Sequence, residues 1–289
     1  MAADLHSATV DPPWDLDAWR QSARAALRAC IAPAQMAWSD ASDASLFGAP
    51  PALAQAPLRA SPPVARAFLP LAARVLAHRD PQRHALLYRL LWRMAEGEPR
   101  LLAHGLDADV FRARALEKTV RRDLHKMKAF VRFREVLGAH EEFVAWFEPD
   151  HHILDLVAPF FVRRFAGMRW AILTPYRSAR WDGSTLAFGA GARPGDAPQA
   201  DAREDLWRTY YANIFNPARL NPRMMRQEMP QKYWKHLPET HTLPTLLREA
   251  GSRVRDMAQR DAEPSRKPVL VSRTRARCEN GVRSTYRKT

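Results

Sequence analysis

The sequence has few cysteines and no long apolar run, and both absences narrow its class. Only two of the 289 residues are cysteines, Cys30 and Cys278, and neither belongs to a CxxC pair or a zinc-type cluster with histidine. This pattern excludes a disulfide scaffold, indicates a reducing cytoplasm, and predicts neither a metal nor a cofactor. No stretch approaches the roughly 18 consecutive apolar residues of a membrane span. The acidic N-terminus lacks the pattern of a signal peptide, so we expect a cytoplasmic protein without a membrane partner.

Acidic residues are also scarce relative to basic ones. The sequence has 45 Lys plus Arg against 31 Asp plus Glu, a formal net charge of +14. A field of this sign attracts polyanions, with nucleic acid first and an anionic membrane surface second. A GC-rich genome would explain why most of these cations are arginine, but it would not explain their excess over acids. The charge balance therefore favours nucleic-acid binding.

Familiar catalytic motifs are missing too, since the sequence contains no GxSxG, P-loop, GxGxxG or HExxH pattern. The only catalytic candidates are His151 and His152, which stand beside Asp150 and Asp155. An Asp–His pair can act as a general acid or base because histidine titrates near neutrality. The alternative is an ordinary helix start that Asp150 supports as N-cap or through the helix dipole, and we favour that alternative.

Hydrophobic periodicity predicts an α+β fold, with a mainly antiparallel sheet of about five strands, helices packed on it, and a preceding N-terminal helical region. The helices expected before the sheet are Asp15–Ala29, Val64–His78, 81–94 after Asp80-Pro81, and Val110–Lys128 capped by Asp109. The first half also contains a possible strand, Gln35–Ser39, and a loop, Asp40–Pro63.

The period then changes from helical spacing to alternation. Strands are expected at Phe130–Val136, Phe143–Phe147, Arg169–Thr174, Ser178–Trp181 and Thr185–Phe188, with a helix over His152–Phe165. Asp182-Gly183 is a hairpin turn signal. A loop over Gly189–Gln199 leads to helices at Asp201–Ile214, Arg219–Met229 and Leu243–Gln259. We predict a mostly helical part over 1–100, an α+β core over 101–258, and a basic, disordered tail over 259–289.

The strongest local feature is a basic stripe in the helix that precedes the sheet. Spacings of four, three, four and three residues place five side chains on one face, opposite the apolar positions: Arg114, Lys118, Arg121, His125 and Lys128. A row of cations can follow the phosphates of a nucleic-acid backbone and release counterions. The alternative is a solvated helix face with intrahelical pairs such as Glu117–Arg121.

A second basic segment, 216–235, mixes cations with flat aromatic rings. Its candidate contacts are Arg219, Asn221, Arg223, Lys232, Tyr233 and Trp234. The cations would hold phosphates while a ring stacks on an unpaired base. The alternative is that Tyr233 and Trp234 pack against the core and expose only their polar tips.

Several separated motifs, in order, resemble a bacterial family of DNA metabolism proteins whose domain has no assigned function. The resemblance rests on Lys126–Phe133, Trp146–His152, Phe161–Phe165, Trp170–Pro175, Trp207–Tyr211, Ile214–Asn221 and Met229–Trp234. It implies a gene neighbour that is a radical-SAM protein for DNA repair or modification, or a fusion in front of a UdgX-type uracil-DNA glycosylase domain. Such a domain would start after about residue 265 with iron–sulfur cysteines. This sequence lacks them, so we expect the catalytic domain to be absent.

Together these features predict a DNA-binding accessory protein in DNA repair, linked to uracil-DNA processing. Arg132 and Arg164 join the basic stripe and the second segment as expected phosphate contacts. Two alternatives stay open. One is an enzyme acting on DNA through His151 and His152, and the other is an adaptor for a radical-SAM or glycosylase-like partner.

Overall fold

A computed structural model describes residues 5–40, 58–60, 64–136 and 141–197, together with Thr245 and Arg248. The helices are α1 (Leu16–Arg28), α2 (Phe68–Ala77), α3 (Arg83–Ala95), α4 (Ala108–Phe130) and α5 (Leu154–Arg164). The strands are β1 (His6–Val10), β2 (Met36–Asp40), β3 (Arg134–Val136), β4 (Glu142–Trp146), β5 (Trp170–Leu173), β6 (Arg177–Trp181) and β7 (Leu186–Ala190). Apart from Thr245 and Arg248, which are helical as expected, the predicted helices over 201–259, the second basic segment and the tail lie outside the described residues.

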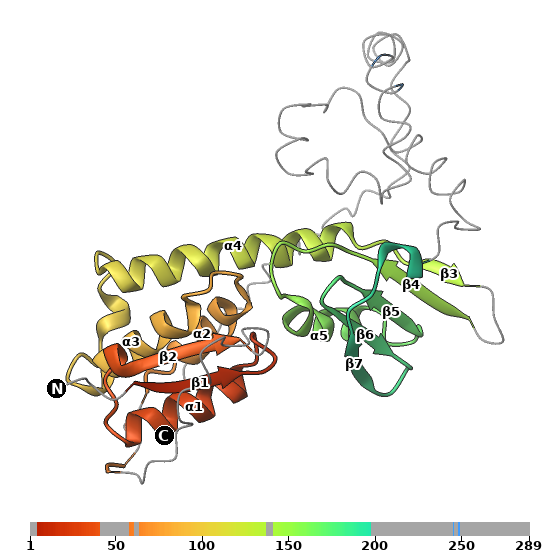
Figure 1. Ribbon diagram of the computed structural model, residues 1–289. Coiled ribbons are helices and arrows are strands. Elements are labelled where there is room, and N and C mark those ends of the chain that lie inside the picture. Colours follow the sequence, from red (N-terminus) through yellow and green to blue (C-terminus); the bar gives the residue numbers. More distant parts are fainter. Residues whose placement is uncertain are drawn as a thin grey trace, which may run out of the picture.

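The expected α+β class is confirmed by a five-stranded sheet in the order β3-β4-β5-β6-β7 (Figure 1). Its neighbouring strands are antiparallel except β4 and β5, which pair in parallel with Phe143 opposite Trp170. That parallel pair needs a crossover, and α5 supplies it between the two strands. The hairpin turn at Asp182 is also present, since its carboxylate accepts bonds from Ser184 N and Thr185 N.

The N-terminal region is only partly helical, because β1 and β2 form a parallel two-stranded sheet linked through α1. We expected β2 but missed β1. Its five residues do alternate, with His6, Ala8 and Val10 buried and the residues between them turned outward. Five residues with one polar residue on the buried side give too weak a pattern to separate a strand from a loop.

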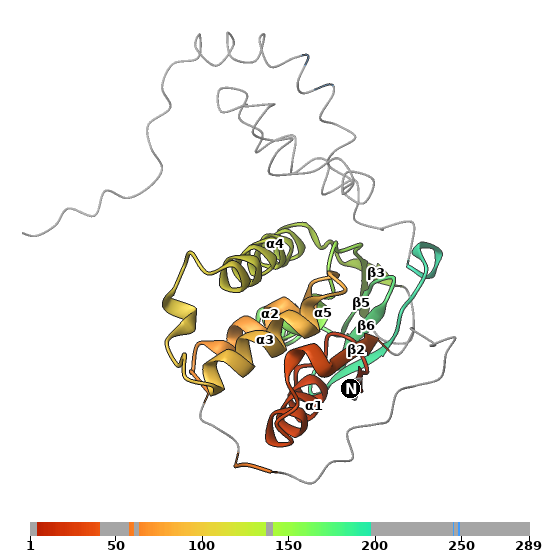
Figure 2. The ribbon, with the colours of Figure 1, turned by 60° about the vertical axis from the view of Figure 1, so that its left-hand side comes forward.

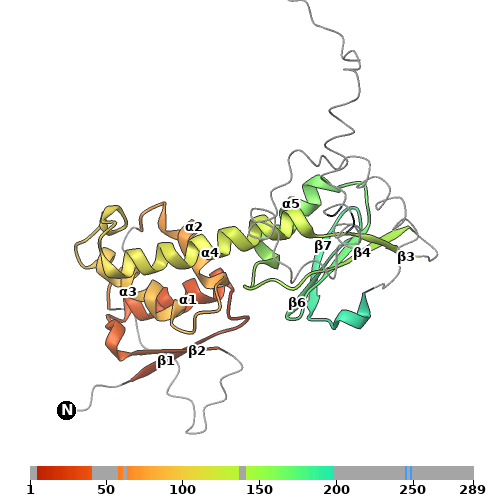
Figure 3. The same cartoon turned by 90° about the horizontal axis from the view of Figure 1, so that it is seen from above.

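Two hydrophobic cores lie side by side, and α4 runs along both (Figures 1 and 3). The first core gathers α1, α2, α3 and the small sheet around residues such as Trp19 and Leu87. The second lies between α5 and the five-stranded sheet, around Trp170. The N-terminal part of α4 contributes to the first core and its C-terminal part, including Val120 and Met127, to the second. No helix in the described ranges is long and apolar enough to cross a membrane.

Several predicted helix boundaries were wrong by a few residues, including the start of α2, which was predicted at Val64 and lies at Phe68. The N-cap of α4 is Asp107, whose carboxylate accepts from Asp109 N and Val110 N. Asp109 instead lies in the first turn and forms an ion pair with Arg89, 2.7 Å away. Helix α3 begins only after Gln82, because the Asp80 side chain caps the preceding turn by accepting from Gln82 N.

The end of α4 was also mispredicted, since Phe130 belongs to the helix and not to a strand. Alternation from Phe130 onward suggested an extended segment, but the apolar helical spacing continues through Met127 to Val131, which is buried in the second core. The chain becomes extended at Val131, and Phe133 then packs edge-on against Phe161. The first strand of the sheet is therefore only three residues long.

The end of β7 differs from the expected loop because Gly189 and Ala190 extend the strand. A Cβ on Gly191, just beyond it, would clash with the carbonyl oxygen of Pro175. The missing side chain thus allows β7 to lie close against the turn between β5 and β6. Ala192 N donates to Thr174 O across the same contact, at 3.0 Å, so this turn is held from both sides.

Candidate functional site

The acidic residues of α4 are turned into the protein. The Glu117 carboxylate, only 13% exposed, accepts from Arg74 Nε on α2 at 2.7 Å. Asp123 is 3% exposed and accepts from the backbone N–H of His151 at 2.9 Å. Glu117 could have neutralised the outer face of α4 by pairing with Arg121 on the same helix. It pairs with Arg74 of α2 instead. The outer face of α4 is left without either acid.

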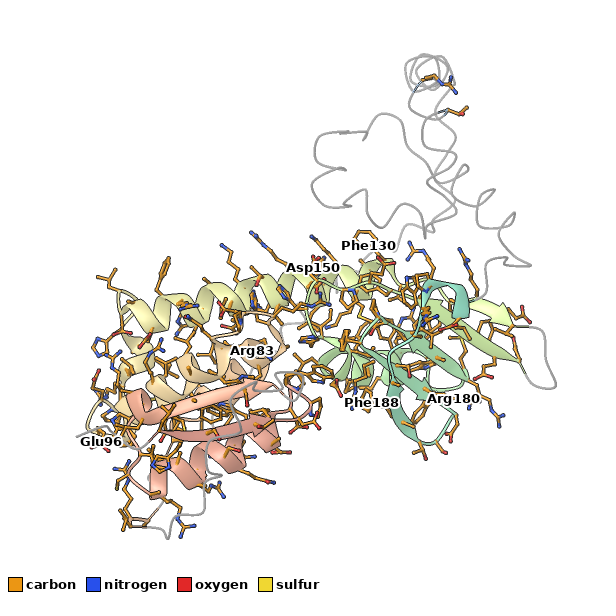
Figure 4. All side chains as sticks on the ribbon, in the orientation of Figure 1. Arg83, Glu96, Phe130, Asp150, Arg180 and Phe188 are labelled. Atoms are coloured by element: carbon orange, nitrogen blue, oxygen red, sulfur yellow. The ribbon has the colours of Figure 1, made fainter. Side chains whose placement is uncertain are left out.

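The five residues of the predicted basic stripe are all exposed on that outer face (Figure 2 shows the helix uncovered by the other elements). Arg114 donates to the Leu102 carbonyl at 2.9 Å, and the Lys128 ammonium lies 5.0 Å from the ring centroid of Phe160. Among the described residues, no ion pair or hydrogen bond engages the side chains of Lys118, Arg121 or His125. Long side chains project from this edge of the molecule in Figure 4. Lys118 and Arg121 therefore keep their charge available for an external anion.

Of the other predicted phosphate contacts, the structure describes only Arg132 and Arg164. Arg132 bends back onto the end of α4, where its Nη1 donates to the carbonyls of Ala129 and Val131. Arg164 is exposed near the end of α5, with its guanidinium 5.4 Å from the Phe165 centroid. The remaining contacts lie outside the described residues: Arg219, Asn221, Arg223, Lys232, Tyr233 and Trp234. The structure thus brings together the predicted cations of α4 but does not test the second segment.

Sequence reasoning overlooked Phe111, which is 69% exposed on α4. It precedes Arg114 by three residues and Lys118 by seven, so it extends the basic stripe by one position. The signal was present in the spacing, because an apolar residue stands there among charged ones. It was not recognised because Phe111 also lies next to Val110, which does belong to the first core.

His151 and His152 lie in a different place, where the two cores meet. We call the surrounding set the histidine junction: Trp14, His78, His151, His152, Asp155, Tyr176 and Arg177. The Trp14 ring stacks on His152 at 4.5 Å between centroids, and Tyr176 meets the same imidazole edge-on at 4.8 Å. The second histidine, His151, lies 4.1 Å from the ring of His78. The rings of His78 and His151 are half-buried. Sequence analysis did not connect the residues of the junction because they lie far apart in the chain.

Hydrogen bonds fix the junction. Trp14 Nε1 donates to Asp155 at 2.9 Å, and the opposite carboxylate oxygen lies 3.1 Å from Arg177 Nε. The loop that carries Trp14 is held by buried Arg83, labelled in Figure 4, whose Nη2 lies 3.1 Å from the Pro13 carbonyl. The expected N-cap role of Asp150 was wrong, because α5 begins after Ile153 and the Tyr176 hydroxyl accepts from Leu154 N instead.

Burial lowers the pKa of two junction histidines, His152 and His78. Burial, with smaller contributions from Arg79, Arg83 and His151, lowers the pKa of His152 to about 3. The pKa of His78 is lowered as well, mainly by burial and against the attraction of Asp80. Burial raises the pKa of Asp155, although Arg177 and Trp14 oppose the change. At neutral pH His152 therefore offers no proton to a substrate, and its ring serves as a packing surface.

We expect the protein to lose stability as the pH falls from about 6.5 toward 3, in part because of His152. The unfolded chain binds a proton on this histidine near its ordinary pKa of 6.5, whereas the folded state binds it only near 3. Protonation below pH 6.5 therefore favours unfolding. Urea unfolding at pH 7 and pH 5 should show a larger loss for the wild type than for His152→Gln. Asp155 and His78 are common to both chains, so equal losses in the two would contradict the buried, neutral state of His152.

Comparison with protein families shows which family the chain belongs to. Residues 81–239, more than half of the chain, match the family described as "Domain of unknown function (DUF4130)". The chain belongs to this family. The matched range contains α4 and the five-stranded sheet, whereas Trp14 and His78 of the junction lie before it. Comparison with curated proteins and with solved structures gave no match.

Because the family carries no assigned function, the site has to be judged by its chemistry. Within the described ranges, no group of three histidine, cysteine, aspartate or glutamate residues is placed to hold a metal ion. The single described cysteine, Cys30, is exposed and unpaired with another thiol. The clearest candidate for an external binding surface is the outer face of α4, a cationic face from which Glu117 and Asp123 point inward.

Proposed function

We propose that the protein binds DNA through the outer face of α4, as an accessory protein in DNA metabolism or repair. The observation that carries the proposal is the inward orientation of Glu117 and Asp123. It leaves the exposed cations of α4 without acidic neighbours on the same helix face. Such a face attracts a polyanion strongly, and the net charge of +14 adds a long-range field of the same sign.

The dimensions of the stripe suit a nucleic-acid backbone. Arg114 and Lys128 are fourteen positions apart, and a rise of 1.5 Å per residue separates them by about 21 Å along the helix axis. Cations repeat along this length at every third or fourth residue. A backbone with regularly spaced phosphates can engage several of them at once and release its condensed counterions.

The biological setting that we propose rests on the motifs described above, which resemble a bacterial DNA metabolism family. That resemblance supports a role beside a radical-SAM protein or a uracil-DNA glycosylase-like protein. The accessory protein would hold DNA while the partner carries out the chemistry.

The test is fluorescence anisotropy of the purified chain with labelled single-stranded and duplex DNA, with and without uracil, across a salt series. We expect the logarithm of the affinity to fall linearly with the logarithm of salt concentration, because each engaged phosphate releases counterions. A preference for uracil would support the link to uracil processing. Lack of binding even at low salt would rule out the proposed function.

A further inference from the structure

One aromatic ring stands in line with the cations of α4. Phe111, Arg114 and Lys118 follow one another at spacings of three and four residues, the spacing that continues to Arg121, His125 and Lys128. The row therefore starts with a phenyl ring, 69% of whose surface is exposed, and contains an exposed imidazole further along. Two flat rings and four permanent cations therefore share a single helix face.

The fold gives no reason for Phe111 to be aromatic. Helix α4 contributes Val110 and Ala113 to the first core, and both side chains are fully buried. Phe111 points away from that core. A single exposed apolar residue is common on protein surfaces, but Phe111 stands in line with the cations of α4, where an exposed flat ring can contact a ligand.

We infer that the outer face of α4 binds single-stranded nucleic acid, with Phe111 stacking on an unpaired base while Lys118 and Arg121 hold phosphates. This inference deepens the proposed function and rests on it. In a duplex, both faces of each base are already stacked on neighbouring bases, so an exposed ring finds no partner there. In a single strand the bases are open, and stacking on aromatic rings between cations is the usual mode of binding.

The shape of the surface favours the same ligand. A straight helix side of about 21 Å can follow an extended strand along its length. A duplex backbone winds around its axis and would leave the row after a short contact, unless the helix entered the major groove. The inner side of α4 is packed against α2, α3 and α5 (Figures 1 and 2), so only one side of the helix is available.

The experiment compares three probes, all labelled and of about twenty nucleotides: a thymidine strand, an abasic strand with the same phosphates, and a duplex. Anisotropy is measured for the wild type, Phe111→Ala, and Phe111→Leu, which keeps an apolar side chain without a flat ring. Leu106→Ala is the control, because Leu106 is fully exposed in the turn before α4. Since Phe111 and Leu106 are both exposed, these variants should fold like the wild type, which circular dichroism would verify.

We expect Phe111→Ala and Phe111→Leu to bind the thymidine strand about tenfold more weakly than the wild type. Their affinity for the duplex and for the abasic strand should stay within about twofold of the wild type, with the same salt dependence, because stacking is not screened by ions. Wild-type protein should also prefer the thymidine strand over the abasic one.

Two results would overturn the inference while leaving the proposed function intact. One is equal wild-type affinity for the thymidine and abasic strands, and the other is unchanged thymidine binding by Phe111→Ala. Failure of the proposed function would look different, because the wild type would then bind none of the three probes at low salt.

Discussion

The double variant Lys118→Glu with Arg121→Glu is expected to bind DNA at least about tenfold more weakly than the wild type at moderate salt. Each lost phosphate contact removes about 0.9 from the slope of log affinity against log salt for duplex DNA and about 0.7 for a single strand, so two lost contacts should make the slope shallower by about 1.8 or about 1.4. The added carboxylates also repel the phosphates. Anisotropy titrations at several salt concentrations measure both quantities.

The matched control is Arg24→Glu with Arg66→Glu, which changes the net charge by the same amount. Arg24 and Arg66 are exposed, and Arg24 lies on α1, on the side of the molecule away from α4 (Figure 1). If local contacts on α4 matter, the control should keep nearly the wild-type slope. Equal losses in the two double variants would mean that net charge alone attracts DNA and that α4 is not the binding face.

Trp14→Ala should lower the free energy of unfolding by about 2–4 kcal/mol, a loss near that of other large aromatic truncations. The half-buried indole stacks on His152, meets Tyr176 edge-on and donates to Asp155. Removing it opens the contact between the two cores and leaves the carboxylate of Asp155 with one fewer donor. Urea unfolding at pH 7 measures the change.

Trp14→Phe separates the two contributions of this residue. The phenyl ring keeps most of the stacking on His152 but loses the hydrogen bond to Asp155, so a smaller loss of about 1–2 kcal/mol is expected. If Trp14→Ala unfolds within about 0.5 kcal/mol of the wild type, the range of ordinary surface substitutions, the loop before α1 does not hold the two cores together.

Local periodicity was sufficient to predict the helices and the larger sheet. Helix α4 followed from apolar residues such as Val120 and Met127 at helical spacing, and the hairpin between β6 and β7 followed from Asp182-Gly183. Boundaries were less accurate where two signals compete. At Phe130 the alternating pattern of the strand region overlaps the last turn of α4. The helix continues to Phe130 because the next residue, Val131, is buried in the second core.

The two candidate sites differ in how far the local sequence could predict them. The basic stripe belongs to one helix, so its spacing was enough to place its cations on a common face. The inward pairing of Glu117 with Arg74 joins two helices and could not be read from the spacing of α4. The histidine junction depends on Trp14 and Asp155, which are 141 residues apart in the chain. No periodic pattern connects such residues, because only the packing of the two cores brings them together.

Helix α4 is shared between the two cores, and this gives a bound nucleic acid a thermodynamic effect on both. Unfolding either core would withdraw part of the surface on which the ligand rests. A ligand that binds only the folded state raises the free energy of unfolding in proportion to the logarithm of its concentration above the dissociation constant. A strand lying along α4 would therefore make the two halves melt together, as one cooperative unit, at a temperature that rises with ligand concentration.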